Sequence, residues 1–369
     1  MTSRRLTDQE RVDWLRLSRT PNIGPVTFAQ LIAKFGSAAE ALAALPELSK
    51  KSGRKRPLTP PPSAEITAEL EAVYRYGAQL ICACEPDYPS LLRNVEPPPP
   101  TLTLYGDAGL LHTKAVAIVG ARNASAAGRK MARDLAGALG EAGYTIVSGL
   151  ARGIDGEAHG ASLNTGTAAV LGGGVDNIYP PQHQGLYHEI AKRGVIVSES
   201  KFAHRATARD FPRRNRIITG LAMGVIVVEA AEKSGSLISA RTAGEQGREV
   251  MAVPGSPLDP RTEGSNRLIR EGAVLVRHAE DVLETLTSLS QMRFEAPPAA
   301  GFIAEDIGDD PPLKEIARVR EALSPSPIAI DEIARAANIS APRCAAILME
   351  LELSGEAYTL PGGMAAKAV

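Results

Sequence analysis

The fold class is decided by the stretch Ala115-Val116-Ala117-Ile118-Val119-Gly120-Ala121-Arg122-Asn123-Ala124-Ser125. Its apolar first half predicts a buried strand that ends at Gly120, and its second half opens a helix. Similar apolar runs recur farther along the chain, at Tyr144–Ser148, Thr167–Leu171, Val195–Ser198, Gly224–Val228 and Val250–Val253. Because a segment long enough for a helix separates each run from the next, the pattern predicts an α/β fold with a doubly wound parallel sheet.

Helices are expected on the N-terminal side of this sheet. Residues 1 to about 44 carry apolar side chains at helical intervals, broken by a turn around Pro21–Pro25. The turn contains Asn22-Ile23-Gly24-Pro25, in which Gly24 permits a tight backbone and Pro25 can open the next helix. This resembles a helix-hairpin-helix, whose glycine turn presents backbone N–H groups to DNA phosphates. A plain helical pair is the alternative, and we slightly prefer it.

The remaining segments divide the 369-residue chain, which exceeds the usual domain length of about 100 to 200 residues. Residues 45–62 are rich in Lys, Arg, Ser and Pro and are interpreted as a linker or loop, followed by a helix near 63–76, a short strand and a stiff spacer at Pro97–Pro100. After a second linker, three helices and a hairpin predict a winged helix. The expected domains are 1–80 (helical), 81–290 (the sheet), 291–312 (linker) and 313–369 (winged helix).

Bulk composition excludes several classes of protein. An apolar share of 44% with 22% charged residues is ordinary for a globular chain. No apolar run approaches the roughly 18 residues of a membrane span, so we expect the protein to stay in the cytosol. The three cysteines, Cys82, Cys84 and Cys344, have no Cys or His partners at ligand spacing, so they are interpreted as structural thiols and no metal site is expected.

The net charge of −1, from 41 Lys and Arg against 42 Asp and Glu, conceals two opposite regions. Residues 111–220 hold 14 basic against 8 acidic residues, a net of +6. Residues 281–369 hold 7 against 14, a net of −7. A polyanion partner is therefore possible for the central region although the whole chain is nearly neutral.

A ligand of a doubly wound sheet binds outside the carboxyl ends of its strands, so the residues after each strand are the candidate site. Gly120 to Ser125 form a glycine turn that leads into a helix N-terminus, which is suited to an anion, and Arg122 adds a planar charged fork. The segment is neither a Walker A loop nor a Gly-x-Gly-x-x-Gly fingerprint. We therefore expect this segment to bind an anion. We do not expect it to bind NAD or ATP, and we expect no other cofactor.

The next two strand ends are also glycine-rich. Ser148–Asp155 contains Arg152 and ends in Asp155, which is expected to cap the following helix. Leu171–Asp176 contains Gly172, Gly173 and Gly174, a triple glycine that lets a ligand backbone approach closely. Both segments can also be read simply as tight turns.

The fourth strand leads into the most basic part of the chain. Residues 201–220 hold six Lys and Arg and one acid, with Phe202 and Phe211 as the only aromatic residues. A charge run is usually a solvated face, but this one falls at the expected ligand edge. Its basic groups can hold phosphates while Phe211 stacks on one base, which favours contact with nucleic acid.

These segments, taken in order, are identified as those of the DNA-processing protein A (DprA/Smf) family. The resemblance is dense from about residue 86 to 280 and looser in the flanking domains. The motifs that carry it are Ile118–Arg122, Ser148–Asp155, Leu171–Asp176 with Tyr179-Pro180, Phe211–Ile218, Ser234–Leu237 and Val253–Gly255.

The resemblance implies an extended Rossmann domain flanked by a helical domain of the sterile-alpha-motif (SAM-like) type and a winged helix. It further implies a non-enzymatic recombination mediator that binds single-stranded DNA, protects it, and loads the RecA recombinase onto it during natural transformation. The expected DNA-binding residues are Gly120, Arg122, Ser125, Arg152, Gly172, Gly173, Gly174, Lys201, Phe211, Arg213, Arg214, Asn215 and Arg216. A homodimer is expected through Leu268, Ile269, Val274 and Leu275.

One departure and two alternatives remain. Many relatives carry a basic residue after the Tyr-Pro pair, where this chain has Pro181, so one phosphate contact is in doubt. A nucleotide or nucleoside-phosphate hydrolase on the same sheet could use Glu199 or Glu229 as acid or base, although their expected role is pairing with Arg and Lys. The winged helix could read duplex DNA, but its helix at 341–353 carries only Arg343 as a base, which favours protein contact.

Overall fold

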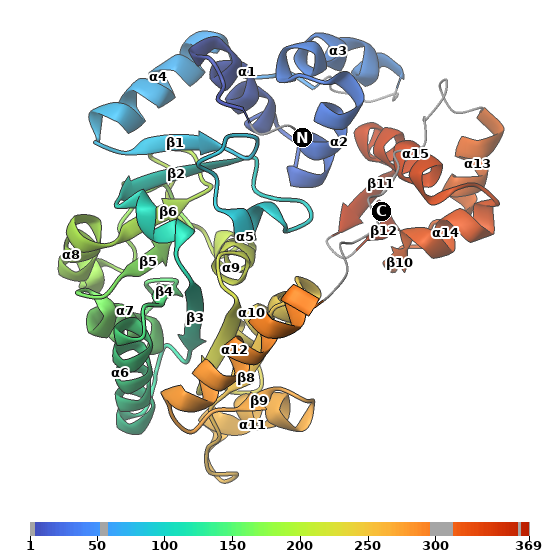
Figure 1. Ribbon diagram of the computed structural model, residues 1–369. Coiled ribbons are helices and arrows are strands. Elements are labelled where there is room, and N and C mark those ends of the chain that lie inside the picture. The colour runs from blue at the N-terminus through green and yellow to red at the C-terminus, as the bar shows by residue number, and fades with distance from the viewer. Residues whose placement is uncertain (1–3, 52–57, 296–312, 361–362, 369) are drawn as a thin grey trace. The chain divides into compact units, whose positions relative to one another are not determined.

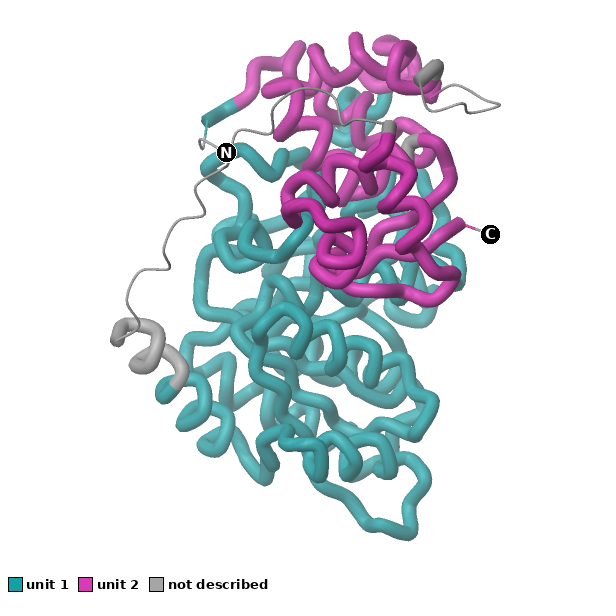
Figure 2. Tube along the Cα trace, turned by 90° about the vertical axis from the view of Figure 1, so that its right-hand side faces the viewer, with its two compact units in different colours: residues 1–5, 68–296 teal, residues 6–67, 297–369 magenta. Residues whose placement is uncertain are grey.

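The computed structural model describes residues 4–51, 58–295, 313–360 and 363–368. The chain forms two compact units (Figure 2): residues 1–5 with 68–296, and residues 6–67 with 297–369. The predicted domain boundaries at residues 80, 290 and 312 remain predictions, and the 291–312 linker lies largely outside the described residues.

The first unit is built on a nine-stranded sheet in the order β1-β2-β6-β5-β4-β3-β7-β8-β9 (Figure 1). Strands β3 to β9 run parallel to one another, whereas β2 pairs antiparallel with both β1 and β6. The strands are β1 (Gln79–Cys82), β2 (Thr101–Gly106), β3 (Ala115–Gly120), β4 (Thr145–Ser148), β5 (Thr167–Val170), β6 (Val195–Ser198), β7 (Gly224–Val228), β8 (Glu249–Ala252) and β9 (Val274–Leu275).

All six strands predicted from the apolar runs are present, so the doubly wound sheet is confirmed. Strands β2 and β9 are additions at the two sides of this predicted core. The helices that accompany the sheet are α5 (Ser90–Arg93), α6 (Ala126–Glu141), α7 (Ile154–Ser162), α8 (Gln184–Arg193), α9 (Asp210–Gly220), α10 (Gly235–Glu245), α11 (Glu263–Arg270) and α12 (Ala279–Glu295), with short 3-10 helices η1 (Ala108–His112), η2 (Pro181–His183) and η3 (Pro260–Thr262).

Burial on both faces explains the continuous apolar runs. Residues 115–119 of the central strand β3 are all buried, because helices cover the sheet on either side. On one face, α6, α7 and α12 pack against β3, β4, β7 and β8 in a single apolar cluster. At Gly120 a side chain would overlap the carbonyl of Val228 and the side chain of Ile154, so glycine is required where β3 meets β7 and α7.

The N-terminal helices are α1 (Asp8–Ser18), α2 (Pro25–Phe35), α3 (Ala38–Lys51) and α4 (Ser63–Arg75). Trp14 and Phe28 make an edge-to-face contact with ring centroids 4.9 Å apart, which joins α1 to α2. The turn between them needs a left-handed residue, but that residue is Asn22, with φ of 68°, whereas Gly24 keeps an extended φ of −85°. The conformational freedom that we assigned to Gly24 is therefore used at Asn22.

The linker expected at residues 45–62 begins later than predicted. Helix α3 continues through Pro46 to Lys51, because Ala41, Leu42 and Leu45 are buried and their packing outweighs the proline. The basic residues 54–56 lie outside the described residues.

The C-terminal winged helix is confirmed, with one strand more than predicted. It contains α13 (Leu313–Ala322), β10 (Ile328–Ala329), α14 (Ile330–Ala337), α15 (Ala341–Ser354), β11 (Ala357–Leu360) and β12 (Met364–Lys367). Its strands form an antiparallel sheet in the order β10-β12-β11 over an apolar core. On α15, Arg343 donates to Glu315 at 3.1 Å, so the one basic group of this helix is engaged within the domain.

Candidate nucleic-acid interface

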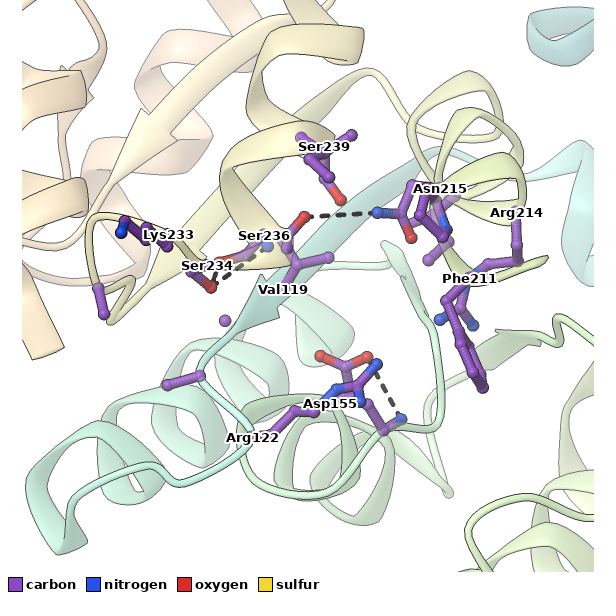
Figure 3. Close-up of a pocket in the computed structure, with 18 of the residues that line it drawn as sticks. Val119, Arg122, Asp155, Phe211, Arg214, Asn215, Lys233, Ser234, Ser236 and Ser239 are labelled. Carbon is purple, nitrogen blue, oxygen red and sulfur yellow. Dashed lines mark hydrogen bonds between the residues drawn. The ribbon is translucent and has the colours of Figure 1, made fainter. Parts of the chain in front are cut away.

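The order in which strands are added to the sheet reverses at β3. The strands that follow it first, β4 to β6, lie on one side of β3, and β7 lies on its other side. The loops after these strands diverge, which opens a crevice at the carboxyl edge. A cleft of about 870 Å³ occupies this point (Figure 3). We call it the switch-point cleft. The residues that line it are 119–123, 151, 155, 179, 206, 208, 211, 212, 214, 215, 218, 231, 233–236, 238, 239 and 261.

Two aromatic rings and an arginine stand together in this cleft. The guanidinium of Arg122 lies 5.3 Å from the centroid of the Phe211 ring, and the centroid of the Tyr179 ring lies 5.3 Å from that of Phe211. Tyr179 is exposed. A smaller hollow of about 270 Å³ continues past these three residues to Arg152. The arrangement can stack a planar base while holding an anion beside it.

Arg214 also lines the cleft, but it is buried. Its guanidinium donates to the carbonyl of Gly149 at 2.7 Å and to the carbonyl of Val170, so it ties together the ends of β4 and β5. Burial lowers the pKa of Arg214 to about 10, although the charge of Asp155 opposes this change. Burial likewise raises the pKa of Asp155, whose carboxylate accepts from the N–H of Gly149 at 3.1 Å. Arg214 is therefore a structural cation in the wall of the cleft.

The N-terminus of α6, predicted as an anion site, holds a carboxylate of the chain itself. Ser125 caps the helix by accepting from the N–H of Gly128 at 2.9 Å. The backbone N–H of Ser125 donates to Glu229 at 2.9 Å, and its hydroxyl donates to the other oxygen of the same carboxylate. Glu229 follows β7 with a left-handed φ of 55°, a strained conformation that these bonds hold in place. Ser125 does not line the cleft, and Glu229 is paired with Ser125 rather than with the Arg or Lys we expected.

Another segment of the chain packs directly against the triple glycine, so a ligand has no space beside it. Side chains at Gly173 and Gly174 would meet the carbonyls of His204 and Lys201, each at 2.8 Å. The N–H of Gly174 already donates to His204 at 2.9 Å. The close approach that we predicted for a ligand backbone is thus made by the segment before α9, and Gly172, Gly173 and Gly174 lie outside the cleft lining.

Arg216 binds Glu199 in a partly buried ion pair with distances of 2.6 and 2.7 Å to the two carboxylate oxygens. This pair confirms the expected role of Glu199. Arg216 is not among the residues that line the cleft, and its contact with DNA stays a prediction. Lys201 and Arg213 are exposed and stand outside the cleft lining as well.

Of the expected DNA-binding residues, the structure brings six to the cleft and its side hollow: Gly120, Arg122, Arg152, Phe211, Arg214 and Asn215. Their contact with DNA stays a prediction. Sequence reasoning missed the start of α10, where Lys233, Ser234, Ser236 and Ser239 form a wall of the cleft (Figure 3). The available signal was Ser234-Gly235-Ser236 a few residues after the fifth apolar run, because a serine at such a place can cap the helix that follows.

The acid–base residues of the hydrolase alternative are both engaged elsewhere. Neither Glu199 nor Glu229 lines the cleft, and among the described lining residues Asp155 is the one carboxylate. Within the described part of the chain, no group of three His, Cys, Asp or Glu side chains could hold a metal ion. The cysteines Cys82, Cys84 and Cys344 are buried, and none of them forms a disulfide with another described residue.

No single described helix is long and apolar enough to cross a membrane. Residues Pro25–Phe35 and Ala38–Ser49 reach that length and apolarity only jointly, and the two helices are bent by 104° at the break.

Comparison with protein families gives three matches that together cover most of the chain. The family model described as DNA recombination-mediator protein A matches residues 79–287. Models described as a DprA-like N-terminal HHH domain and a DprA winged helix domain match residues 8–72 and 308–363.

Individual relatives agree with these matches. Protein Smf of Escherichia coli (strain K12) is 39% identical over 306 residues, which are 82% of this chain and 81% of Smf. DNA processing protein DprA of Bacillus subtilis (strain 168) is 43% identical over 220 residues, which are 59% of this chain and 74% of the relative.

Two solved structures extend the similarity to the fold. DNA processing protein A from Streptococcus pneumoniae superposes with a TM-score of 0.65 at 32% identity and covers 76% of this chain and 98% of its own. The DNA processing protein A from Helicobacter pylori, studied for its single-stranded DNA binding mode, superposes with a TM-score of 0.53 at 30% identity and covers 57% and 96%.

Proposed function

The chain belongs to the DNA recombination-mediator protein A (DprA) family, and on that premise we propose that it binds single-stranded DNA in the switch-point cleft, protects the strand and loads the RecA recombinase onto it during natural transformation. The observation that carries the proposal is the arrangement of Arg122 over the ring of Phe211 at the carboxyl edge of the sheet. It offers a charge for a phosphate and a flat face for a base within one cleft.

The small number of aromatic rings favours binding of single-stranded DNA of any sequence. Aromatic residues make up only 4% of the chain, and the rings of Tyr179 and Phe211 can stack on one or two bases. Stacking on a ring face tolerates every base, and it requires an unpaired base that can turn out of its own stack. A duplex offers no such base. We therefore infer weak sequence preference and a clear preference for single strands.

The charge distribution supports the same partner. The excess of +6 within residues 111–220 lies on the region that supplies most of the cleft lining. The DNA processing protein A of Helicobacter pylori, a structural relative, was studied for its single-stranded DNA binding mode, which adds support by similarity.

A gel-shift titration with single- and double-stranded DNA over a salt series tests the proposal. We expect the single strand to bind more tightly at every salt concentration. Each phosphate that a cation neutralises should steepen the fall of log affinity with log salt by roughly 0.7. A flat salt response, or equal affinity for the duplex, would contradict the proposal.

Transfer of the strand to RecA is a separate part of the proposal. It predicts that the rate at which RecA assembles on a single strand covered by a single-strand-binding protein rises when this chain is added. An unchanged rate, measured with a chain that binds the strand normally, would remove RecA loading and leave DNA binding in place.

A further inference from the structure

We propose that Glu229 is a specificity-determining residue, whose carboxylate occupies the phosphate site of the fold from within and so keeps free nucleotides out of it. The proposal rests on the proposed function and deepens it, because it explains why the switch-point cleft takes a strand of DNA rather than a mononucleotide. We call the Glu229 carboxylate, together with Ser125 and Gly128 against which it lies, the α6 plug.

The N-terminus of α6 occupies the place where doubly wound folds hold a dinucleotide. β3 is the first parallel strand along the chain, and its neighbours in the sheet are β4 on one side and β7 on the other. In dinucleotide-binding proteins of this architecture, the turn after that strand lays the pyrophosphate on the N-terminus of the next helix. Here the turn leads from Gly120 into α6, so the first turn of α6 is the default site for the phosphate of a free nucleotide.

The carboxylate of Glu229 already uses the donors that a phosphate would need. The backbone N–H of Ser125 donates to one of its oxygens at 2.9 Å, and the Ser125 hydroxyl donates to the other. That hydroxyl accepts in turn from the N–H of Gly128 at 2.9 Å. Hydrogen bonds to a charged acceptor are the stronger kind, and the negative charge also matches the positive end of the helix dipole.

The same carboxylate fills the space in front of the helix. A Cβ at Gly128 would lie 2.5 to 2.7 Å from the carboxylate carbon and both oxygens of Glu229, so the carboxylate rests directly on the glycine backbone in the first turn of α6. A glycine at such a point is what lets a phosphate approach a helix closely. Glu229 is itself only 8% exposed. A phosphate could enter only if this side chain left.

The backbone at Glu229 shows that the side chain is held here against local preference. Its φ of 55° lies in the left-handed region, which glycine adopts without strain and glutamate rarely adopts. Glu229 directly follows β7, whose last residue, Val228, pairs with Gly120 of β3, so the strand carries the carboxylate to the end of α6. Glycine would suit this backbone better but would leave the helix end open. The strain therefore indicates a function of the side chain.

Closing this site separates a strand from its monomers. A mononucleotide carries a terminal phosphate of about −1.5 to −2 charge, the group that an open helix N-terminus would capture. A phosphodiester inside a strand carries a single charge and can be held by an exposed cation such as Arg122 in the cleft. With the end of α6 closed, affinity depends on contacts that a strand repeats over several nucleotides and a monomer makes only once.

Inorganic phosphate, titrated into the full chain by calorimetry at constant ionic strength, tests the α6 plug. Glu229→Gly and Glu229→Asn empty the site with residues that tolerate a left-handed backbone. Glu229→Gln removes the charge but leaves the space filled. The matched control is Glu232→Gly, which removes an exposed carboxylate three residues farther along the chain.

Both emptied variants should bind phosphate at least roughly tenfold more tightly than the wild type, Glu229→Gln and Glu232→Gly do. Phosphate should also raise their melting temperatures, and it should restore the fold of either variant that is partly unfolded without it. Ser125→Ala, added to Glu229→Gly, should remove most of the gain. Failure of phosphate to bind or refold the emptied variants would overturn the proposal, as would an equal gain in Glu232→Gly.

Competition connects the α6 plug to the binding of a strand. Thymidine monophosphate should weaken the binding of a short oligothymidylate to Glu229→Gly severalfold and leave its binding to the wild-type chain nearly unchanged. Equal competition in the two chains would contradict the selectivity that we assign to Glu229. If the wild-type chain binds no oligothymidylate at all, the proposed function fails, whereas the phosphate titration still decides whether Glu229 closes the site at α6.

Discussion

Three arginines on α9 lie close together in the sequence but have three different roles. The role of each depends on the residues around it. Arg213 is exposed, Arg214 is buried against backbone carbonyls, and Arg216 is paired with Glu199. A count of charges along residues 201–220 treats all three as candidates for phosphate contact. Packing decides which guanidinium is left for a ligand, since a helix turns successive side chains in different directions.

Arg214 provides the sharpest stability test at this scale. Replacement with Ala removes the cation that interacts with Asp155, and it removes the guanidinium that donates to the carbonyls of Gly149 and Val170. We expect the free energy of unfolding to fall by about 3 kcal/mol. Urea unfolding of Arg214→Ala beside Arg213→Ala measures it, and the exposed Arg213 should cost no more than about 0.5 kcal/mol. Equal stability of the two variants would show that Arg214 is not a structural cation.

The cleft residues that the sequence predicted correctly follow directly from strand ends. Gly120 and Arg122 come immediately after β3, and the rule that ligands bind at the carboxyl edge is enough to place them. The triple glycine satisfies the same rule but is covered by the segment before α9. No local pattern shows that a loop folds back on a strand end, because this depends on contacts between residues far apart in the sequence.

Whether a strand or helix could be predicted from the sequence depended on its length and on how deeply it is buried. The six long apolar runs predicted their strands because both faces of a central parallel strand are buried. Strand β9 has only two residues and β2 follows a run of prolines, so neither carries a periodic signal. The extension of α3 through Pro46 depends on tertiary packing, which overrides local propensity.

The edge element β9, with α11 beside it, carries the prediction of a homodimer. β9 is the last strand of the described sheet, and Leu275 on it is 42% exposed. An apolar edge strand of this kind tends to be covered by another chain. Leu275→Glu should shift the sedimentation coefficient from dimer to monomer. Leu258→Glu is the control, because Leu258 is 93% exposed but lies in a loop outside the patch. A wild-type chain that sediments as a monomer would end the proposal.

For the whole molecule, the buried His159 makes stability depend on pH. Burial lowers its pKa from 6.5 to about 3, and its ring accepts from the N–H of Leu150 and contacts the hydroxyl of Thr167 at 2.7 Å. Below pH 6.5 the His159 ring binds a proton in the unfolded chain, whereas in the folded chain it stays neutral until the pH approaches 3. The contribution of His159 is therefore complete above pH 6.5 and is lost as the pH falls toward 3.

Between pH 8 and pH 5 this loss amounts to about 2 kcal/mol of unfolding free energy. His159→Gln cannot take up the proton, so its stability should change less over the same range, whatever its absolute value. Urea unfolding of both chains at the two pH values gives the difference. The same pH dependence in both would mean that His159 is not kept neutral by the fold.

Near-neutral net charge is likewise a property of the whole molecule that hides the site. The basic excess in residues 111–220 and the acidic excess in residues 281–369 nearly cancel in the sum. Within the cleft, the charge that matters is carried by a few side chains, of which Arg122 is exposed beside an aromatic ring. Affinity for a polyanion should thus depend on this residue rather than on the overall charge.

The most direct test is the affinity of Arg122→Ala for a short single-stranded oligonucleotide at low salt, measured by fluorescence anisotropy beside the wild-type chain and Arg193→Ala. Arg193 is an exposed arginine on α8 outside the cleft lining, so its replacement removes the same charge elsewhere. We predict that Arg122→Ala binds at least roughly tenfold more weakly than the wild type, whereas Arg193→Ala stays within about twofold. Equal losses in the two variants, or none in Arg122→Ala, would contradict the assignment of the switch-point cleft as the DNA site.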